Sequence, residues 1–350
     1  MAGARWTALV AVAALAAGAV GCGSGESGTD VRKIALVTPG RYNEADWSAQ
    51  AKAVVEQFPR QLGVRVDIAD ASQAGEVRDV LDQVSHEGNQ LVIAHDSRYA
   101  DAAAAVAERT DVPALVWGDR PDAGEGLVGH ITVQDKEGGY MAGVIAARSA
   151  ITRRLGIVVI ADGSPWDLET WNRTAGGFVA GARSVDPRAV ITYAQVGQDG
   201  NATVDEVHDT ALRMQKAGAQ MIFALGGAST LGALRAIEER GGENQYIGVV
   251  GDKSQFNRDN FVLTSVMWET RPVLRQALRD LRAGTFAEHP YRLTLKNRGI
   301  WLLSTGRTPS DAFETATAAQ ARMEDGTLDV PVTSTSDAVE QLIDGTPQEG

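Results

Sequence analysis

Five of the seven tryptophans in this chain of 350 residues stand where a protein of alternating strands and helices can hold a small molecule. The carboxyl ends of parallel strands form the crevice in which such proteins bind their ligands. An indole ring there can stack on a flat ring or on the face of a sugar. We expect roughly two of the five to cap the core instead, as large aromatic residues often do. The five follow the ends of expected strands or crossings between expected lobes: Trp47, Trp117, Trp166, Trp171 and Trp268. Of these, we expect Trp47, Trp171 and Trp268 to contact a ligand.

Two carboxylates and one glycine complete the expected binding site. Asp119 follows the apolar run PALVWG, and Asp252 follows YIGVVG. Each carboxylate can accept a hydrogen bond from a hydroxyl or N–H group of a ligand, although either could instead cap a helix. Gly227, in GGAST, lies between an expected strand and helix, where a backbone N–H can hold a polar ligand atom. The alternative for Gly227 is a tight turn that needs glycine.

The sequence lacks the motifs of catalysis and of metal or phosphate binding. The five histidines, at 86, 95, 130, 208 and 289, stand singly and do not form HExxH or a comparable ligand spacing. There is no GxxxxGK[ST] phosphate loop, and ADGSPW, at 161–166, does not have the GxSxG form of a nucleophile elbow. We therefore expect no metal and no cofactor, and we expect binding rather than catalysis.

The elements that would position these residues alternate regularly along the chain. KIALVT, VRVDIAD, QLVIAH and PALVWGD are apolar runs separated by single helical patterns. A second alternating set begins at LGIVVIA and ends at YIGVVGD. Continuous apolar strands separated by helices predict parallel sheets that are covered on both faces. Two such sets in tandem predict an α/β fold of two doubly wound, Rossmann-like lobes that face each other across a cleft and are joined by a hinge.

The last portion of the chain, from VLTSVMW onward, is too short for a third lobe, so we expect it to cross back to the first lobe and then return to the second. The predicted organisation has five parts: a signal peptide at 1–21, a flexible tether at 22–31, an N-terminal lobe at 32–133 and 269–288, a C-terminal lobe at 134–268 and 289–330, and a weakly ordered tail at 331–350.

The N-terminus has the pattern of an exported lipoprotein. One positive charge, Arg5, precedes an apolar segment that is too short to cross a membrane, and small residues follow it. The only cysteine, Cys22, comes directly after Ala19-Val20-Gly21 and before the flexible stretch GSGESGTD. This resembles a bacterial lipobox, in which the cysteine is acylated and becomes the first residue. The alternative is a plain signal peptide with an incidental cysteine. We expect an anchor on the extracytoplasmic face of the cell membrane.

The composition restricts the partners. The net charge of −12 argues against nucleic acid, whose phosphates need clustered lysine and arginine. With a single cysteine, the chain cannot form an internal disulfide. We expect a monomer that binds a small molecule.

The helical pattern KEGGYMAGVIAARS, at 136–149, makes a family recognisable. It resembles the Glu-x-x-Tyr-Leu-Ala-Gly-x-x-Ala-Ala helix of the basic-membrane-protein (Bmp) family of substrate-binding lipoproteins, and we expect its glycines to serve helix–sheet packing. A Gly-Phe-x-x-Gly signature is matched by Gly177, Phe178 and Gly181. Other segments that resemble the family follow in the same order over 33–303: AGAQMIFALGG, YIGVVGD, VLTSVMW and YRLTLKNRGIWL.

The resemblance implies a type I periplasmic-binding-protein fold, like that of the family's purine nucleoside receptors, which feed ABC importers. At the family's ligand positions, Trp47 takes the place of a phenylalanine that stacks on the base. Pro39 and Val250 replace acids, Asp252 is kept, and Trp268 stands where the family has lysine. We therefore expect a small polar ligand that contains a ring and is nucleoside-like, and an ABC permease as partner.

Two other functions fit parts of this pattern. A ligand-sensing lipoprotein could signal to a membrane receptor without transport. An exported nucleoside or sugar hydrolase would need a cleft with a nucleophile and a base, and no such set is apparent in the sequence.

Overall fold

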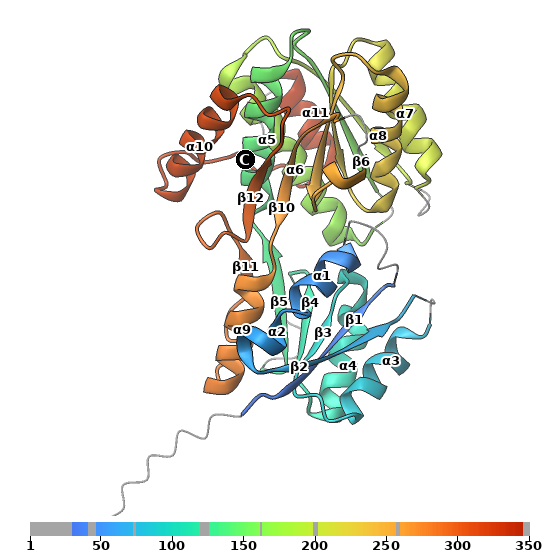
Figure 1. The fold of residues 1–350 in the computed structure, drawn as a ribbon, viewed down its shortest axis with the longest axis vertical. Helices are drawn as coiled ribbons and strands as arrows, with labels where there is room; N and C mark the ends of the chain where they lie inside the picture. The colour runs from blue at the N-terminus through green and yellow to red at the C-terminus, as the bar shows by residue number, and fades with distance from the viewer. Residues whose placement is uncertain are drawn as a thin grey trace, which may run out of the picture.

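The computed structural model describes residues 30–40, 47–72, 75–119, 126–161, 163–198, 202–256 and 260–345, which form two lobes placed end to end (Figure 1). The predicted signal peptide, Cys22 and nearly all of the predicted tether lie outside these residues. Each lobe contains one six-stranded sheet with helices on both faces. This is the doubly wound arrangement that the alternating sequence pattern predicts.

The first sheet has the order β11-β5-β4-β3-β1-β2, and its strands run parallel. The apolar runs form its centre, where β1, β3, β4 and β5 are almost wholly buried. Its strands are β1 (Lys33–Thr38), β2 (Arg65–Asp70), β3 (Val92–Ala94), β4 (Ala114–Trp117), β5 (Val128–Val133) and β11 (Tyr291–Leu293).

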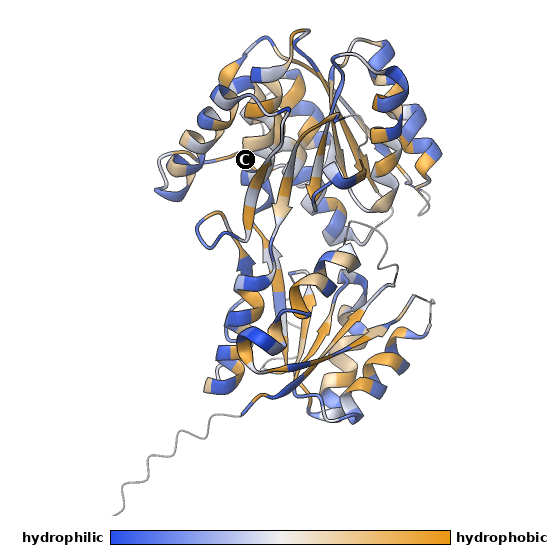
Figure 2. Ribbon diagram, in the orientation of Figure 1, coloured by the Kyte–Doolittle hydropathy of each residue, from blue (hydrophilic) through white to orange (hydrophobic). Residues whose placement is uncertain are grey.

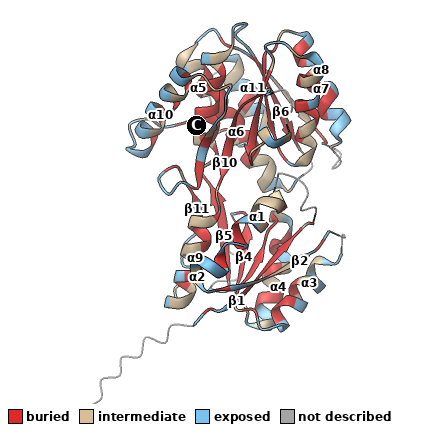
Figure 3. Ribbon diagram, viewed as in Figure 1, coloured by how far each residue is buried: buried red, intermediate tan, exposed pale blue. Residues whose placement is uncertain are grey.

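The second sheet has the order β12-β10-β9-β8-β6-β7, and only β12 runs antiparallel to its neighbour. Figure 2 shows the apolar strands at the centre of both lobes, and Figure 3 shows that they are buried. The strands of the second sheet are β6 (Arg154–Ile160), β7 (Val190–Val196), β8 (Met221–Leu225), β9 (Gln245–Val250), β10 (Val262–Trp268) and β12 (Ile300–Ser304).

The helices connect and cover these strands. The α-helices are α1 (Trp47–Val55), α2 (Phe58–Leu62), α3 (Val77–His86), α4 (Ala100–Thr110), α5 (Asp135–Ser149), α6 (Pro165–Val185), α7 (Val204–Lys216), α8 (Leu231–Arg240), α9 (Arg271–Ala283), α10 (Ser310–Glu324) and α11 (Ser336–Asp344). The described residues also form three short 3-10 helices, η1 (Ser97–Tyr99), η2 (Ala228–Thr230) and η3 (Ser254–Phe256).

In the part of the chain that the structure describes, three segments pass between the lobes. They run from β5 to α5, from β10 to α9, and from β11 to β12. From the sequence we expect the chain to return to the second lobe at residue 289. In the structure, β11 still pairs with β5 in the first sheet. Tyr291 is fully buried there, because it packs beside Gly129 and Phe286. The return therefore follows Leu293.

The described part of the tail, up to residue 345, also differs from the prediction of weak order over 331–350. Thr335 caps α11, which contacts α6, and Arg183 of α6 donates hydrogen bonds to the carbonyl oxygens of Leu342 and Ile343. Thr333 is fully buried, and its hydroxyl donates to the carbonyl oxygen of Asn172 at 2.8 Å. Only Val339 of α11 is buried, so the apolar face of this helix is very short. The polar residues on either side of it make the segment look like a loop in the sequence.

Helices α5 and α6 cross at backbone contact, and glycines make this possible. A Cβ atom added to Gly139 or Gly143 of α5 would lie 2.0 or 2.1 Å from a carbonyl oxygen of α6. In return, a Cβ on Gly177 or Gly181 of α6 would lie 2.0 Å from a carbonyl oxygen of α5. The prediction of helix–sheet packing holds for Gly138, which faces Val266 of β10, but the other two glycines of α5 serve a helix–helix contact.

Replacing Gly143→Ala should destabilise the protein, because the methyl group would overlap the backbone of α6. We expect the free energy of unfolding to fall by roughly 1–3 kcal/mol or more, the cost of overpacking a closely packed site. Urea unfolding followed by circular dichroism measures the change.

Gly306→Ala is the matched control. Gly306 is exposed, and the nearest atom to an added Cβ is 3.7 Å away. Equal stability of the two variants would show that the α5–α6 contact can accept side chains.

Candidate functional site

The five tryptophans gather into one cluster between the lobes. Trp47 begins α1 and Trp117 ends β4 in the first lobe, while Trp166 and Trp171 come from α6 and Trp268 ends β10 in the second. The Trp268 ring stacks between Trp117, with centroids 5.9 Å apart and planes at 22°, and Trp171, at 5.3 Å and 15°. Trp47 lies 4.5 Å from Trp117, and Trp166 lies 6.1 Å from it. The ends of two strands and the first turns of α1 and α6 thus bring together rings from distant parts of the sequence.

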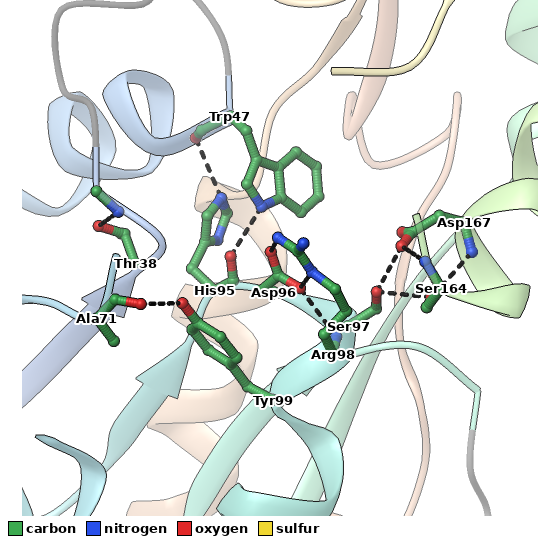
Figure 4. A network of polar contacts seen from close by, with 11 residues as sticks. Thr38, Trp47, Ala71, His95, Asp96, Ser97, Arg98, Tyr99, Ser164 and Asp167 are labelled. Carbon is green, nitrogen blue, oxygen red and sulfur yellow. Dashed lines mark hydrogen bonds and ion pairs between the residues drawn. The ribbon is translucent and has the colours of Figure 1, made fainter. Parts of the chain in front are cut away.

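His95 orients two of these rings. The Trp117 indole N–H donates to His95 Nδ1 at 3.0 Å, so Nδ1 is the acceptor nitrogen and the proton lies on Nε2. Nε2 then donates to the carbonyl oxygen of Trp47, while the Trp47 indole N–H donates to the carbonyl oxygen of His95 at 2.8 Å (Figure 4). Burial lowers the pKa of His95 to about 4. The imidazole is therefore neutral near pH 7 and serves as a fixed connector.

The indoles nearly fill the space that they enclose. The cavity beside Trp47, His95, Trp117 and Trp268 has room for about 10 Å³, which is the volume of roughly one water molecule. Trp117, Trp268 and Trp171 are 1, 4 and 8% exposed, whereas Trp47 and Trp166 are half-buried. The rings thus pack on one another in this arrangement.

Hydroxyl and carboxylate groups join the lobes next to the cluster. Ser97, in η1 of the first lobe, donates to Asp167 Oδ2 of α6 at 2.7 Å (Figure 4). Its oxygen also lies 2.8 Å from the Ser164 hydroxyl, which in turn accepts from the Asp167 backbone N–H in a capping box. Burial raises the pKa of Asp167 above its usual range, against the opposing effect of the hydrogen bonds from Ser97 and Ser164. A partly desolvated carboxylate thereby links the two lobes.

A larger cavity, which we name the charged cleft, lies where the chain leaves β5 for the second lobe. It has room for about 450 Å³. The lining residues come from both lobes, from the β5–α5 crossing and from the C-terminal segment: Asp119, Thr132, Val133, Gln134, Asp135, Lys136, Pro165, Trp166, Glu169, Arg173, Arg292 and Val332.

Most of the charges in this lining neutralise one another. Arg173 of α6 binds the buried Asp135 at 2.8 Å and also binds Glu169. Burial raises the pKa of Asp135 to about 6, although the hydrogen bond from Arg173 opposes this effect. Lys136 binds Asp329 at 3.1 Å and the carbonyl oxygen of Val330 at 2.6 Å. These contacts fix the first turn of α5 against α6 and the C-terminal segment.

The residues expected from the sequence fall into three groups. Trp47, Trp171 and Trp268 lie together in the cluster, and Asp119 lines the charged cleft. Asp252 accepts hydrogen bonds from the backbone N–H and the hydroxyl of Ser254, so it caps its own turn. Gly227 precedes η2 with ordinary φ and open space around it. Neither Asp252 nor Gly227 lines the two cavities.

Sequence reasoning missed His95, Ser97 and Arg173. His95 does stand at the end of the apolar run QLVIAH, and that position could have drawn attention to it. The described part of the chain holds no group of three or more His, Cys, Asp or Glu residues arranged to bind a metal ion.

Comparisons with known proteins agree with this architecture. The family model of PnrA-like ABC transporter substrate-binding proteins (Bmp) matches residues 31–300. The ABC transporter nucleoside-binding protein BmpA of Lactococcus lactis is 26% identical over 93% of this chain and 96% of its own. Basic membrane protein A of Borreliella burgdorferi is 22% identical over 75% of this chain and 76% of its own.

Solved structures support the fold. A solute-binding protein of an ABC transporter system from Conexibacter woesei superposes with a TM-score of 0.71 at 23% identity, over 86% of this chain and 99% of its own. A second solute-binding protein, from Aeropyrum pernix, superposes with a TM-score of 0.73 at 17% identity, over 90% of this chain and 98% of its own. The two doubly wound lobes thus form the type I periplasmic-binding-protein fold that the sequence predicts. The match to the family model, together with this fold, shows that the chain belongs to the Bmp family of PnrA-like ABC transporter substrate-binding proteins.

Proposed function

We propose that this protein is an extracytoplasmic binding protein that captures a small polar ligand containing a ring and delivers it to an ABC permease. The observation that carries the proposal is the meeting of tryptophans from both lobes at the carboxyl ends of β4 and β10. Rings in this position can stack on a flat ligand from two sides. The name of the Lactococcus relative, a nucleoside-binding protein, supports a nucleoside-like ligand.

The volumes imply that the cluster must open before a ligand can enter it. Pockets for small molecules usually measure about 300–1,000 Å³, far more than the 10 Å³ inside the tryptophan cluster. A ring can enter the cluster only if the lobes separate or an indole turns away. The three crossings between the lobes provide the hinge for such a motion. We therefore propose that the ligand enters an open form and that the lobes close on it.

The polar groups at the site suit binding better than catalysis. The Asp167 carboxylate already accepts hydrogen bonds from Ser97 and Ser164, and the Asp135 carboxylate is bound to Arg173. His95 has both ring nitrogens engaged and a lowered pKa. Groups held in this way do not form a nucleophile with a free base.

Trp47→Ala should weaken ligand binding, because Trp47 is half-buried at the edge of the cluster and so can offer a stacking surface. We expect a loss of roughly 1–3 kcal/mol in binding free energy, which is about five- to 150-fold in Kd. Stability without ligand should fall by less than the 3–5 kcal/mol typical of a deleted core aromatic. A thermal-shift panel of nucleosides, bases and sugars identifies a ligand, and calorimetry then measures its affinity.

Trp301→Ala is the control, because Trp301 is 37% exposed on β12 and takes no part in the cluster. It should leave the affinity unchanged. Unchanged affinity in the Trp47 variant, together with a large stability loss, would instead make Trp47 a core residue.

We also propose that acylated Cys22 anchors the protein to the membrane. In the described part of the chain no helix is long and apolar enough to span a membrane. The anchor would then depend on Cys22, in the segment that resembles a lipobox.

Cys22→Ala should release the protein from the membrane, because the thiol that carries the lipid would be lost. Detergent phase partitioning followed by immunoblotting measures the distribution, with Ser24→Ala as the matched control in the same segment. Retention of the Cys22 variant in the detergent phase would show that another feature anchors the chain.

A further inference from the structure

The charged cleft is large enough for a ligand even though the tryptophans fill the space beside it. Its volume of about 450 Å³ falls within the usual range for small-molecule sites. Trp166 lies between the two regions, because it lines the cleft and also packs 6.1 Å from Trp117. Trp166 is half-buried, so part of its ring remains available to a flat ligand.

Arg292 differs from the other cations of this lining. Arg173 binds Asp135 and Glu169, and Lys136 binds Asp329. Arg292, which lies on β11, is exposed, and its only hydrogen bond from the side chain within the described residues is a long one, 3.3 Å from Nε to the Thr132 hydroxyl. A guanidinium has five N–H donors in a planar fork. Four of the five N–H groups of Arg292 are therefore available to donate to a ligand.

Asp119 is the corresponding free anion. Its carboxylate is exposed in the same cleft and has no hydrogen bond or ion pair within the described residues. A ligand that fits both groups would carry a negative charge toward Arg292 and hydroxyl or N–H donors toward Asp119. The planar fork of an arginine matches a carboxylate or a phosphate with two parallel hydrogen bonds.

We propose that the charged cleft binds a ring-containing ligand through an anionic substituent, a carboxylate or a phosphate, held by Arg292. This inference rests on the proposed function and narrows its ligand class. A neutral nucleoside offers Arg292 only uncharged acceptors, which make weaker hydrogen bonds. Arg292 would therefore select the anionic form of a ring compound over its neutral counterpart.

Two matched pairs of compounds test this selection by calorimetry. Orotate is uracil with a carboxylate, and uridine 5′-monophosphate is uridine with a phosphate. In at least one pair, the anion should bind the wild-type protein at least about tenfold more tightly than its neutral partner. The pair that shows the preference identifies the group as a carboxylate or a phosphate. Higher salt should reduce the preference, because the cleft is open to solvent.

Arg292→Gln should remove the preference, because it lowers the affinity for the anion much more than the affinity for the neutral partner. The substitution loses one long hydrogen bond at an exposed position, so the melting temperature without ligand should stay the same. Arg60→Gln removes the same charge from an exposed site on α2, outside the cleft, and should keep the preference.

The two proposals fail in different ways. Equal binding within both pairs, or a preference that survives Arg292→Gln, would overturn the role of Arg292 while leaving a ring-binding protein. If no nucleoside, base, sugar or ring anion binds at all, the proposed function fails and this inference fails with it.

Discussion

The candidate site depends on the backbone contact between α5 and α6. Glycines on both helices bring carbonyl oxygens to within about 2 Å of where a side chain would begin, so the two helices can take only one spacing. The first turns of α6 then project Trp166, Asp167 and Trp171 toward the first lobe, while α5 begins where the chain leaves β5. The ion pair between Arg173 and the buried Asp135 joins the first residue of α5 to the middle of α6. One packing constraint thereby sets both the crossing and the second-lobe side of the site.

With the lobes in contact, the tryptophans occupy part of the space that a ligand would need. Each aromatic pair contributes about 0.5–1.5 kcal/mol beyond its buried area. On the proposed function, a ligand must replace indole–indole contacts with contacts of its own, so a flat ring that can stack on both lobes is favoured over a flexible chain. The affinity then depends on the difference in free energy between the cluster packed on itself and the cluster packed on the ligand, and not on the filling of an empty pocket.

The sequence predicts the architecture well because the fold is encoded locally. Apolar runs such as KIALVT and VLTSVMW become buried strands, and the strand ends place Trp117 and Trp268 where a parallel sheet requires them. The contacts between lobes are not encoded in this way. Ser97 and Asp167 are 70 positions apart, and each resembles an ordinary helix cap in the sequence. The histidine link between two indoles was equally hidden, because a single histidine at a strand end fits many environments.

A crystal structure of the mature protein with a saturating ligand, chosen from the thermal-shift panel, tests the central claim most directly. We expect the ring of the ligand to lie between the lobes, within about 4.5–7 Å of the centroid of at least one cluster tryptophan, and to contact residues of both sheets. A ligand bound to one lobe alone, with the five indoles still stacked as they are here, would contradict the central claim.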